Sequence, residues 1–247
     1  MTNGLTAMTY CVAMKLADGL VFVADSRTNA GVDNISTFRK LFTFGNGRDH
    51  ALVLLSAGNL ATTQSIVELL KRRIEEAEEN LMTLPSMYDE AAYIGRLMRE
   101  IIDRDTHPQQ SQGVDLGCSL LLGGQIRGEE PRLFLIYPQG NFIEASAETP
   151  FFQIGEFKYG KPILDRIITP NTPLETALTC GLISMDSTIK SNLTVDLPLD
   201  VLIYDKDSYS LDRTRQISAE DEQFLALRKA WGGGIRELFN RLPTTEL

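Results

Sequence analysis

Histidine is rare in this chain of 247 residues, which contains only His50 and His107. Neither has a second ligand at metal-binding spacing, so we do not expect a multi-histidine metal centre or a histidine base. The glycine run at 232–234 follows no predicted strand, which argues against a phosphate-binding loop. The sequence therefore predicts neither a metal nor an organic cofactor.

Basic residues are also fewer than acidic ones. Lysine and arginine total 24 against 33 aspartates and glutamates, for a formal net charge of −9 at pH 7. An acidic surface repels nucleic acid and anionic membranes, so we expect neither as a partner. No apolar run is long enough to cross a bilayer, and residues 1–8 lack the segments of a signal peptide. Three cysteines in apolar surroundings fit reduced residues of a cytoplasmic protein.

Two β-hairpins are predicted near the start of the chain. Residues 9–16 and 20–25 are rich in Val, Phe, Met and Ala, and the Asp-Gly pair between them favours a tight turn. A second hairpin is predicted from strands at 40–44 and 51–56 around a Gly-Asn-Gly turn. The near-continuous apolarity of residues 20–24 indicates a strand that is covered on both faces.

Helical periodicity follows these strands. Apolar residues repeat at helical spacing over 66–77 and 93–102. The remaining predictions are strands at 116–122, 132–137 and 199–204, a helix at 173–189 with Pro173 near its first position, and a helix at 219–242 that is interrupted or bent at its three glycines. This order predicts an α+β fold of two antiparallel sheets flanked by helices, in a single domain without a flexible linker.

Thr9 is the residue on which the functional hypothesis depends. It follows Met8 directly and opens the first predicted strand. If the chain begins at Thr9, one residue supplies both a hydroxyl nucleophile and a free α-amine. The ordinary pKa of an α-amine is about 7.7–8.0, so this group can accept a proton at neutral pH. With a residue before it, Thr9 is an ordinary strand threonine.

Asp25 and Lys40 are spaced to reach the same place as Thr9. Asp25 ends the second strand of the first hairpin, and antiparallel pairing can bring it beside the start of the first strand. Lys40 opens the third strand. Lys40 would lower the pKa of the Thr9 hydroxyl, and Asp25 would orient Lys40 and keep it charged. Taken singly, Asp25 fits a turn and Lys40 a solvated position, so the specific signal is the group of three.

The chain resembles the proteasome β-type subunits, and in particular the bacterial Anbu (ancestral β-subunit) group. The matching stretches are residues 8–14 (MTYCVAM), 20–33 (LVFVADSRTNAGVD), 35–40 (ISTFRK), 56–59 (SAGN), 155–160 (GEFKYG) and 184–187 (SMDS). The resemblance covers most of the chain. It implies an N-terminal nucleophile hydrolase with a four-layer αββα sandwich, which cleaves peptide bonds and assembles from many copies.

The resemblance also implies roles for single residues. By position Thr9 resembles the nucleophile, and Asp25 and Lys40 resemble the aspartate and the lysine beside it. Gly58 matches the glycine whose backbone N–H contributes to the oxyanion hole, as a donor at a strand-to-helix junction can. Arg27 resembles a supporting residue of the site, although a solvated arginine would look the same.

Two later residues match the family more weakly, and one departs from it. Asp186 resembles an aspartate that helps to hold the nucleophile and its amine, and Ser191 resembles the serine that partners it. Both also fit the end of a helix, where Ser and Asp bond locally. Glu156 stands where many proteasome β subunits have a serine, so the contact that this serine makes in those subunits is not expected here.

Residues 1–8 bear directly on activity. While they are attached, Thr9 has an amide nitrogen in place of an amine and should be inactive. We expect them to be absent from the mature chain of residues 9–247, either because translation starts at Met8 or because a short leader is cleaved.

The leading hypothesis is a threonine peptidase that acts on peptides or unfolded protein inside a self-assembled ring or open spiral. A catalytically silent scaffold subunit and a hydrolase of a small amide or an amide-linked conjugate are the alternatives. The sequence does not distinguish a ring from a spiral, and it gives no signal for a regulatory ATPase partner.

Overall fold

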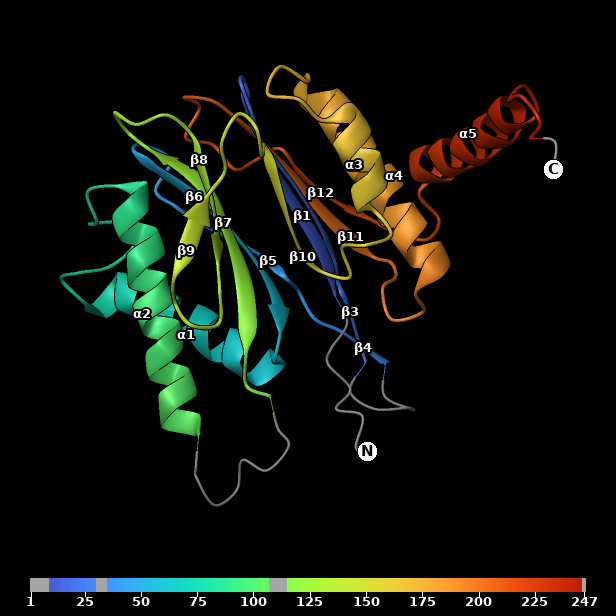
Figure 1. Ribbon diagram of the computed structural model, residues 1–247. Coiled ribbons are helices and arrows are strands. Elements are labelled where there is room, and N and C mark those ends of the chain that lie inside the picture. Colours follow the sequence, from blue (N-terminus) through green and yellow to red (C-terminus); the bar gives the residue numbers. More distant parts are fainter. Residues whose placement is uncertain (1–8, 30–34, 107–114, 246–247) are drawn as a thin grey trace.

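Two five-stranded antiparallel sheets lie face to face at the centre of the computed structural model, whose described residues are 9–29, 35–106 and 115–245 (Figure 1). The strand order is β10-β1-β2-β11-β12 in the first sheet and β5-β6-β7-β8-β9 in the second. The first sheet consists of β1 (Tyr10–Leu16), β2 (Gly19–Asp25), β10 (Phe151–Gly155), β11 (Leu199–Asp205) and β12 (Thr214–Ile217). The second consists of β5 (Leu41–Gly45), β6 (His50–Gly58), β7 (Cys118–Ile126), β8 (Arg132–Ile136) and β9 (Phe142–Glu144). A separate ribbon pairs β3 (Arg27–Asn29) with β4 (Ile35–Thr37).

Helices cover the outer face of each sheet. The second sheet carries α1 (Leu60–Glu76) and α2 (Met87–Asp105), and the first carries α3 (Lys161–Ile167) and α4 (Leu174–Ser191). The last helix, α5 (Glu222–Phe239), starts beside α4 and projects away from the body (Figure 1). The four-layer αββα sandwich predicted from the sequence is therefore confirmed.

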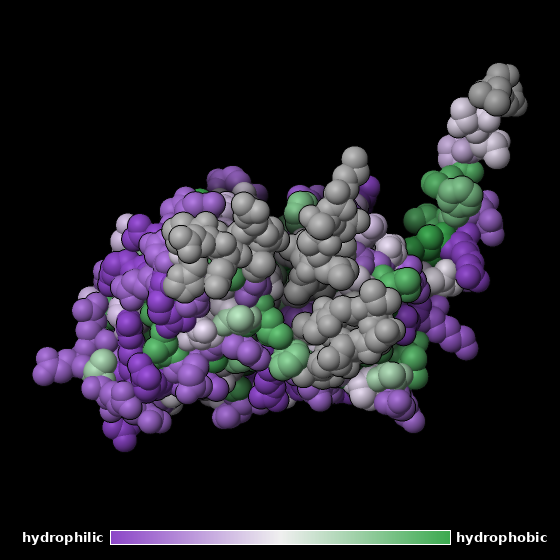
Figure 2. All heavy atoms as spheres, turned by 90° about the horizontal axis from the view of Figure 1, so that it is seen from below, coloured by the Kyte–Doolittle hydropathy of each residue, from purple (hydrophilic) through white to green (hydrophobic). Residues whose placement is uncertain are grey.

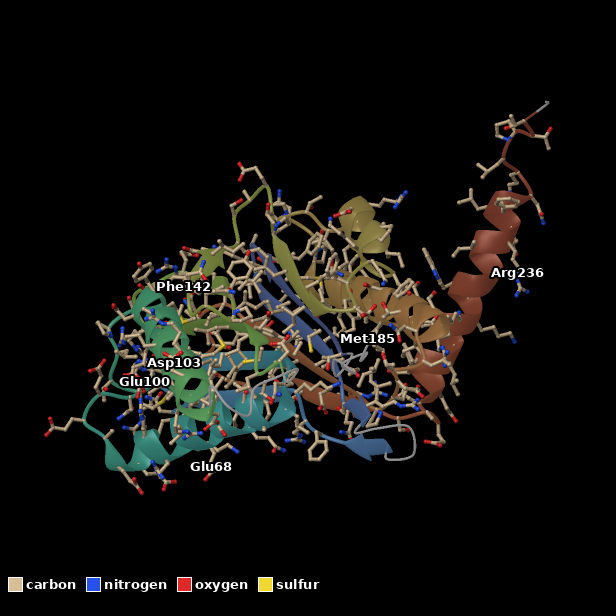
Figure 3. The ribbon with its side chains drawn as sticks, turned by 60° about the horizontal axis from the view of Figure 1, so that its bottom comes forward. Glu68, Glu100, Asp103, Phe142, Met185 and Arg236 are labelled. Atoms are coloured by element: carbon tan, nitrogen blue, oxygen red, sulfur yellow. The ribbon has the colours of Figure 1, made fainter. Side chains whose placement is uncertain are left out.

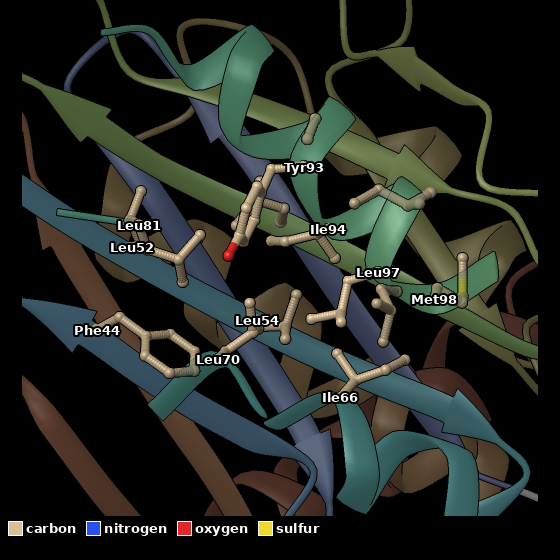
Figure 4. Close-up of a cluster of buried hydrophobic side chains, with 14 of the residues drawn as sticks. Phe44, Leu52, Leu54, Ile66, Leu70, Leu81, Tyr93, Ile94, Leu97 and Met98 are labelled. Carbon is tan, nitrogen blue, oxygen red and sulfur yellow. The ribbon is translucent and has the colours of Figure 1, made fainter. Parts of the chain in front are cut away.

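The core is divided into three layers because side chains alternate along each strand. Phe22, Leu55 and Leu121 are buried between the two sheets, whereas Val23 points the other way, toward α4. A third cluster packs α1 and α2 against the outer face of the second sheet (Figure 4). Burial of each such side chain stabilises the fold by about 1.5–3 kcal/mol. Strand β2 is thus covered on both faces, as its apolar run predicted.

Polar caps fix where the helices over the second sheet begin. The Asn59 side chain accepts a hydrogen bond from the Thr62 N–H at the start of α1. The Ser86 hydroxyl does the same for the Asp89 N–H at the start of α2. Each cap satisfies a donor that the helix itself leaves unpaired. As a result α1 begins directly after Gly58.

The prediction of a break at Gly232–Gly234 was wrong, since α5 runs without interruption from Glu222 to Phe239. A glycine costs a helix about 1 kcal/mol, but it removes no hydrogen bond and introduces no clash. Good helix formers on both sides therefore carry the helix through. Several short elements were not predicted, namely β3, β4, β9, β10, α3 and β12. Strand β12 is a polar edge strand in which only Ile217 is buried, so it lacks an apolar pattern.

No helix among the described residues is both long and apolar enough to span a membrane. The predictions about residues 1–8 and His107 lie outside the described residues.

Candidate active site

Thr9 lies directly before β1, an inner strand of the first sheet, and is buried. Its carbonyl accepts a hydrogen bond of 2.7 Å from the Glu156 N–H, just past the end of β10. Gly155 adopts φ of +82°, and a Cβ atom there would lie 1.7 Å from the Thr9 oxygen. Only glycine allows this approach, so the chain after β10 holds Thr9 in place.

Asp25 lies beside the start of β1, as the predicted hairpin requires. The β1–β2 register pairs Cys11 with Ala24, which puts Asp25 opposite Tyr10. The Tyr10 N–H donates to Asp25 Oδ1 at 3.0 Å, and the carboxylate is completely buried. The residue after Thr9 is therefore bonded directly to this carboxylate.

Lys40 precedes β5 and is buried against the same carboxylate. Its Nζ donates to Asp25 Oδ1 at 2.9 Å, to Asp25 Oδ2 at 2.8 Å and to the Arg27 carbonyl at 2.5 Å. Burial raises the pKa of Asp25 to about 6, and the Lys40 ammonium opposes that rise. At neutral pH the carboxylate is therefore largely ionised, and the three bonds fix the direction of the ammonium.

Thr9, Lys40 and Gly58 line one pocket, together with Arg39, Ser56, Ala57, Leu60 and Thr63. The pocket has a volume of about 20 Å³, enough for about one water molecule. Gly58 has φ of +113°, and a Cβ there would lie 2.6 Å from the Gly117 oxygen. The pocket therefore brings a hydroxyl, an ammonium and a glycine backbone together at the end of β6. An ammonium beside a hydroxyl favours the ionised hydroxyl.

Arg27 supports this group through its backbone and its side chain. Its carbonyl accepts the third Lys40 hydrogen bond, and its Nη1 donates to Asp196 Oδ2 at 2.7 Å. Asp196 was not predicted as part of the site, and it lies 169 residues further along the chain. A carboxylate that pairs with Arg27 is not identifiable from spacing at that separation. Asp196 thus fixes the arginine whose carbonyl orients Lys40.

The structure does not bring Asp186 or Ser191 into this group. The carboxylate of Asp186 is paired with Lys190 on α4 and Arg228 on α5, and Ser191 is exposed at the end of α4. Neither lines the pocket around Thr9. Asp186 faces α5 because the helical repeat of α4 directs it toward that neighbour, which the sequence alone does not place.

A larger hollow adjoins the pocket across Ala57 and Gly58. It has a volume of about 490 Å³, and its lining includes Asp115, Gln139 and Glu156. The Glu156 carboxylate is mostly buried and lies 3.5 Å from Lys158 Nζ. The departure from serine at this position therefore puts a carboxylate near the Thr9 backbone. Among the described residues no group of three or more His, Cys, Asp or Glu side chains is arranged to hold a metal ion.

The sequence profile of the proteasome subunit family matches residues 6–196 of the chain. Among solved structures, Anbu (ancestral beta-subunit) from Yersinia bercovieri is 57% identical, with a TM-score of 0.92, over 97% of this chain and 99% of that one. The Anbu complex from Pseudomonas aeruginosa, described as a helical assembly, is 52% identical with a TM-score of 0.93, over 96% and 98% of the two chains.

Proteasome subunits of archaea are more distant relatives. Proteasome subunit beta 2 of Pyrobaculum aerophilum is 25% identical over 206 residues, which cover 83% of this chain and 92% of the relative. Proteasome subunit alpha of Methanosarcina acetivorans is 28% identical over 140 residues, or 56% of this chain and 52% of the relative. The chain thus matches only about half the length of that α subunit.

Proposed function

The chain belongs to the proteasome subunit family, and on this premise we propose that it is a threonine peptidase whose nucleophile is Thr9. The observation that carries the proposal is the pocket lined by Thr9, Lys40 and Gly58, with Lys40 held by both oxygens of Asp25. A buried, triply bonded ammonium beside a hydroxyl is an arrangement suited to activating that hydroxyl.

The proposed reaction has two steps. In the first, Thr9 Oγ attacks the substrate carbonyl, and the α-amine of Thr9 takes the hydroxyl proton. The Gly58 N–H stabilises the oxyanion, and the amine passes its proton to the leaving nitrogen as the peptide bond breaks. In the second, water attacks the resulting ester and releases the acid. Lys40 lowers the pKa of the Thr9 hydroxyl throughout, while Asp25 and the Arg27 carbonyl keep the Lys40 ammonium oriented.

This mechanism requires Thr9 to be the first residue, because an amide nitrogen cannot accept the proton. Its carbonyl is bonded to Glu156, so loss of the preceding residues leaves Thr9 anchored. We therefore expect the intact mass of the active protein to correspond to a chain that begins at Thr9.

The direct test is covalent labelling by a threonine-directed electrophile, followed by peptide mass spectrometry. We expect one adduct on Thr9, and a loss of turnover of at least about 10⁴-fold in Thr9→Ala. Thr9→Ser keeps the hydroxyl and should retain measurable activity. Undiminished turnover by a chain that still carries residues 1–8 would contradict the proposal.

A small amide or an amide-linked conjugate is the second substrate class. The pocket beside Thr9 has a volume of about 20 Å³, and a small acyl group fits it as well as a peptide that extends into the adjoining hollow. Comparison of kcat/KM for short peptides and for small acyl amides separates the two classes. A scaffold role without catalysis would leave every activity unchanged in Thr9→Ala.

We further propose that the chain associates with copies of itself. The support is the similarity to the Pseudomonas aeruginosa Anbu complex, which is described as a helical assembly. Sedimentation of the purified protein tests this point independently of any activity. A monomer at all concentrations would contradict it.

A further inference from the structure

One apolar stripe runs along the whole of α5. Its members are Phe224, Leu227, Trp231, Ile235 and Leu238, spaced three or four residues apart, so they lie on one face of the helix. Phe224 is buried in the core outside the first sheet, and Leu227 packs against the same core. The first half of the stripe is therefore covered by the body of its own chain.

The second half of the stripe continues beyond the body. Ile235 is 45% exposed, Leu238 60%, Phe239 73% and Leu242, just past the helix, 53%. We call these four residues the α5 tip. Hydrophobic side chains are visible along the projecting arm in Figure 2, and Figure 3 shows Arg236 far out on it. Contiguous exposed apolar surface of this kind marks an interaction site.

The arm is held at a fixed angle by Asp186. This carboxylate is 2% exposed, and it accepts hydrogen bonds from Arg228 Nε at 2.5 Å and from Lys190 Nζ at 2.7 Å. The Arg228 guanidinium also lies over the Phe224 ring at 5.5 Å. The ion pair between Arg228 and Asp186 joins the first half of α5 to α4, so the tip is presented in a defined direction. Such preorganisation lowers the entropy that binding costs.

A groove with an apolar floor lies at the other end of α5. Its volume is about 560 Å³, and its floor is formed by Leu178, Leu182, Val201, Ile217 and Leu227. We call it the root groove. Its rim carries charges of both signs, from Glu175, Asp221, Arg213 and Arg215. The α5 tip is flanked by Arg236, Glu237 and Arg241, so no excess of one sign opposes contact between the two surfaces.

We propose that the root groove of one copy receives the α5 tip of a second copy of this chain. The tip cannot reach the groove of its own chain, because α5 is one continuous helix of 18 residues and spans about 27 Å. A projecting apolar tip and an apolar groove on the same molecule are the two halves of one contact between copies. The inference specifies the surface behind the self-association proposed above and is independent of the chemistry at Thr9.

The first test changes the tip, where substitution does not disturb the folded core. The double variant Leu238→Glu/Phe239→Glu puts two carboxylates where the contact requires apolar burial. We expect the dissociation constant between copies, measured by sedimentation, to rise about 100-fold or more. The matched control is Leu193→Glu, since Leu193 is 88% exposed and lies outside α5. Unchanged association of the tip variant would overturn the proposal.

The second test locates the contact. Phe239→Cys is made in one copy and Thr179→Cys, on the exposed lining of the root groove, in a second copy of different mass. The three native cysteines are buried. Mild oxidation should yield the mixed disulfide dimer, and the pair Phe239→Cys with Leu193→Cys should not. Equal yields from the two pairs, or no product from the first, would overturn the proposal. Carrying out both tests in Thr9→Ala separates their outcome from that of the peptidase proposal.

Discussion

Two carboxylates in different layers of the molecule are equally buried but differ in charge. Asp25, at the strand-end site, and Glu90, on α2, are both 0% exposed. Asp25 is bonded twice to the Lys40 ammonium and once to the Tyr10 N–H, whereas neither oxygen of Glu90 has a hydrogen-bond partner among the described residues. Burial raises the pKa of Asp25 to about 6 and that of Glu90 to about 9.

At pH 7, Asp25 is therefore largely ionised and Glu90 protonated. The difference shows that the partner, and not the depth of burial, decides whether a buried carboxylate keeps its charge. In the site, the Lys40 ammonium pairs with Asp25, and this pairing fixes it next to Thr9. The helical layer contains a neutral acid for which the fold provides no compensating contact.

Removal of the cation from the site should have the largest effect. Lys40→Met leaves Asp25 buried without its ammonium, and loss of one partner from a buried pair costs about 3–5 kcal/mol. We expect the free energy of unfolding, measured by urea denaturation, to fall by this amount at pH 7. Labelling of Thr9 should also be lost.

The double variant Asp25→Asn/Lys40→Met is the control for Lys40→Met. It removes both charges, so most of the stability should return while labelling of Thr9 stays absent. If the double variant were no more stable than Lys40→Met, the buried pair would not be the source of the cost.

Neutralising Glu90, the acid without a partner among the described residues, should raise the free energy of unfolding, whereas Lys40→Met lowers it. In the unfolded chain Glu90 has a pKa of 4.5, and in the folded chain of about 9. The folded state holds the proton more tightly, so the contribution of Glu90 is fully present below pH 4.5 and is lost as the pH rises toward 9. Glu90→Gln should therefore stabilise the protein by about 3 kcal/mol at pH 7 and leave it nearly unchanged at pH 4.

Thermal unfolding of wild type and Glu90→Gln over this pH range provides the measurement. Glu68→Gln, on the exposed face of α1, is the matched control and should shift stability by less than about 0.5 kcal/mol at any pH. A wild-type stability that did not decline between pH 5 and pH 8 relative to Glu90→Gln would show that Glu90 titrates normally.

The two sides of the contrast also differ in how far the sequence predicts them. Asp25 was placed beside the start of β1 because a local Asp-Gly turn sets the hairpin register. Lys40 was expected to reach the same place because it opens the third predicted strand, and the structure adds the bidentate contact with Asp25. Burial of Glu90 was not predicted, because a glutamate in the first turn of a helix normally faces solvent and stabilises the helix dipole.

Long-range contacts account for the remaining differences between the sequence prediction and the structure. Asp186 was assigned to the site, but it pairs with Arg228 across 42 residues, and the packing angle of α5 on α4 decides that contact. Asp196 was missed because its partner Arg27 lies in a different part of the chain. Local patterns thus predicted the sheets and the centre of the site, whereas its supporting residues depend on packing between distant segments.

Asp186 is an intermediate case, buried but paired with cations that are partly exposed. Side chains of Lys190 and Arg228 are 52% and 27% exposed, so they can turn toward water when the carboxylate is lost. Asp186→Asn should therefore destabilise the protein by only about 2 kcal/mol, less than Lys40→Met. Hydrogen exchange should rise in α5 and not at the start of β1. Faster exchange at β1 would restore Asp186 to the site.

The smallest loss of stability should come from removing the cap of α2. The pH dependence of this loss tests whether the burial of Glu90 depends on the first turn of its helix. Ser86→Ala removes the bond to the Asp89 N–H and should cost about 1 kcal/mol at pH 5. At pH 8 the cost should be smaller, because a frayed first turn exposes Glu90 to water and relieves the penalty on its ionised form. Asn59→Ala removes the equivalent cap of α1, whose first turn has no acidic residue, so its cost should be the same at both pH values. Equal pH dependence in the two variants would mean that Glu90 stays sealed from water when its helix frays, and that burial on α2 is fixed by packing alone.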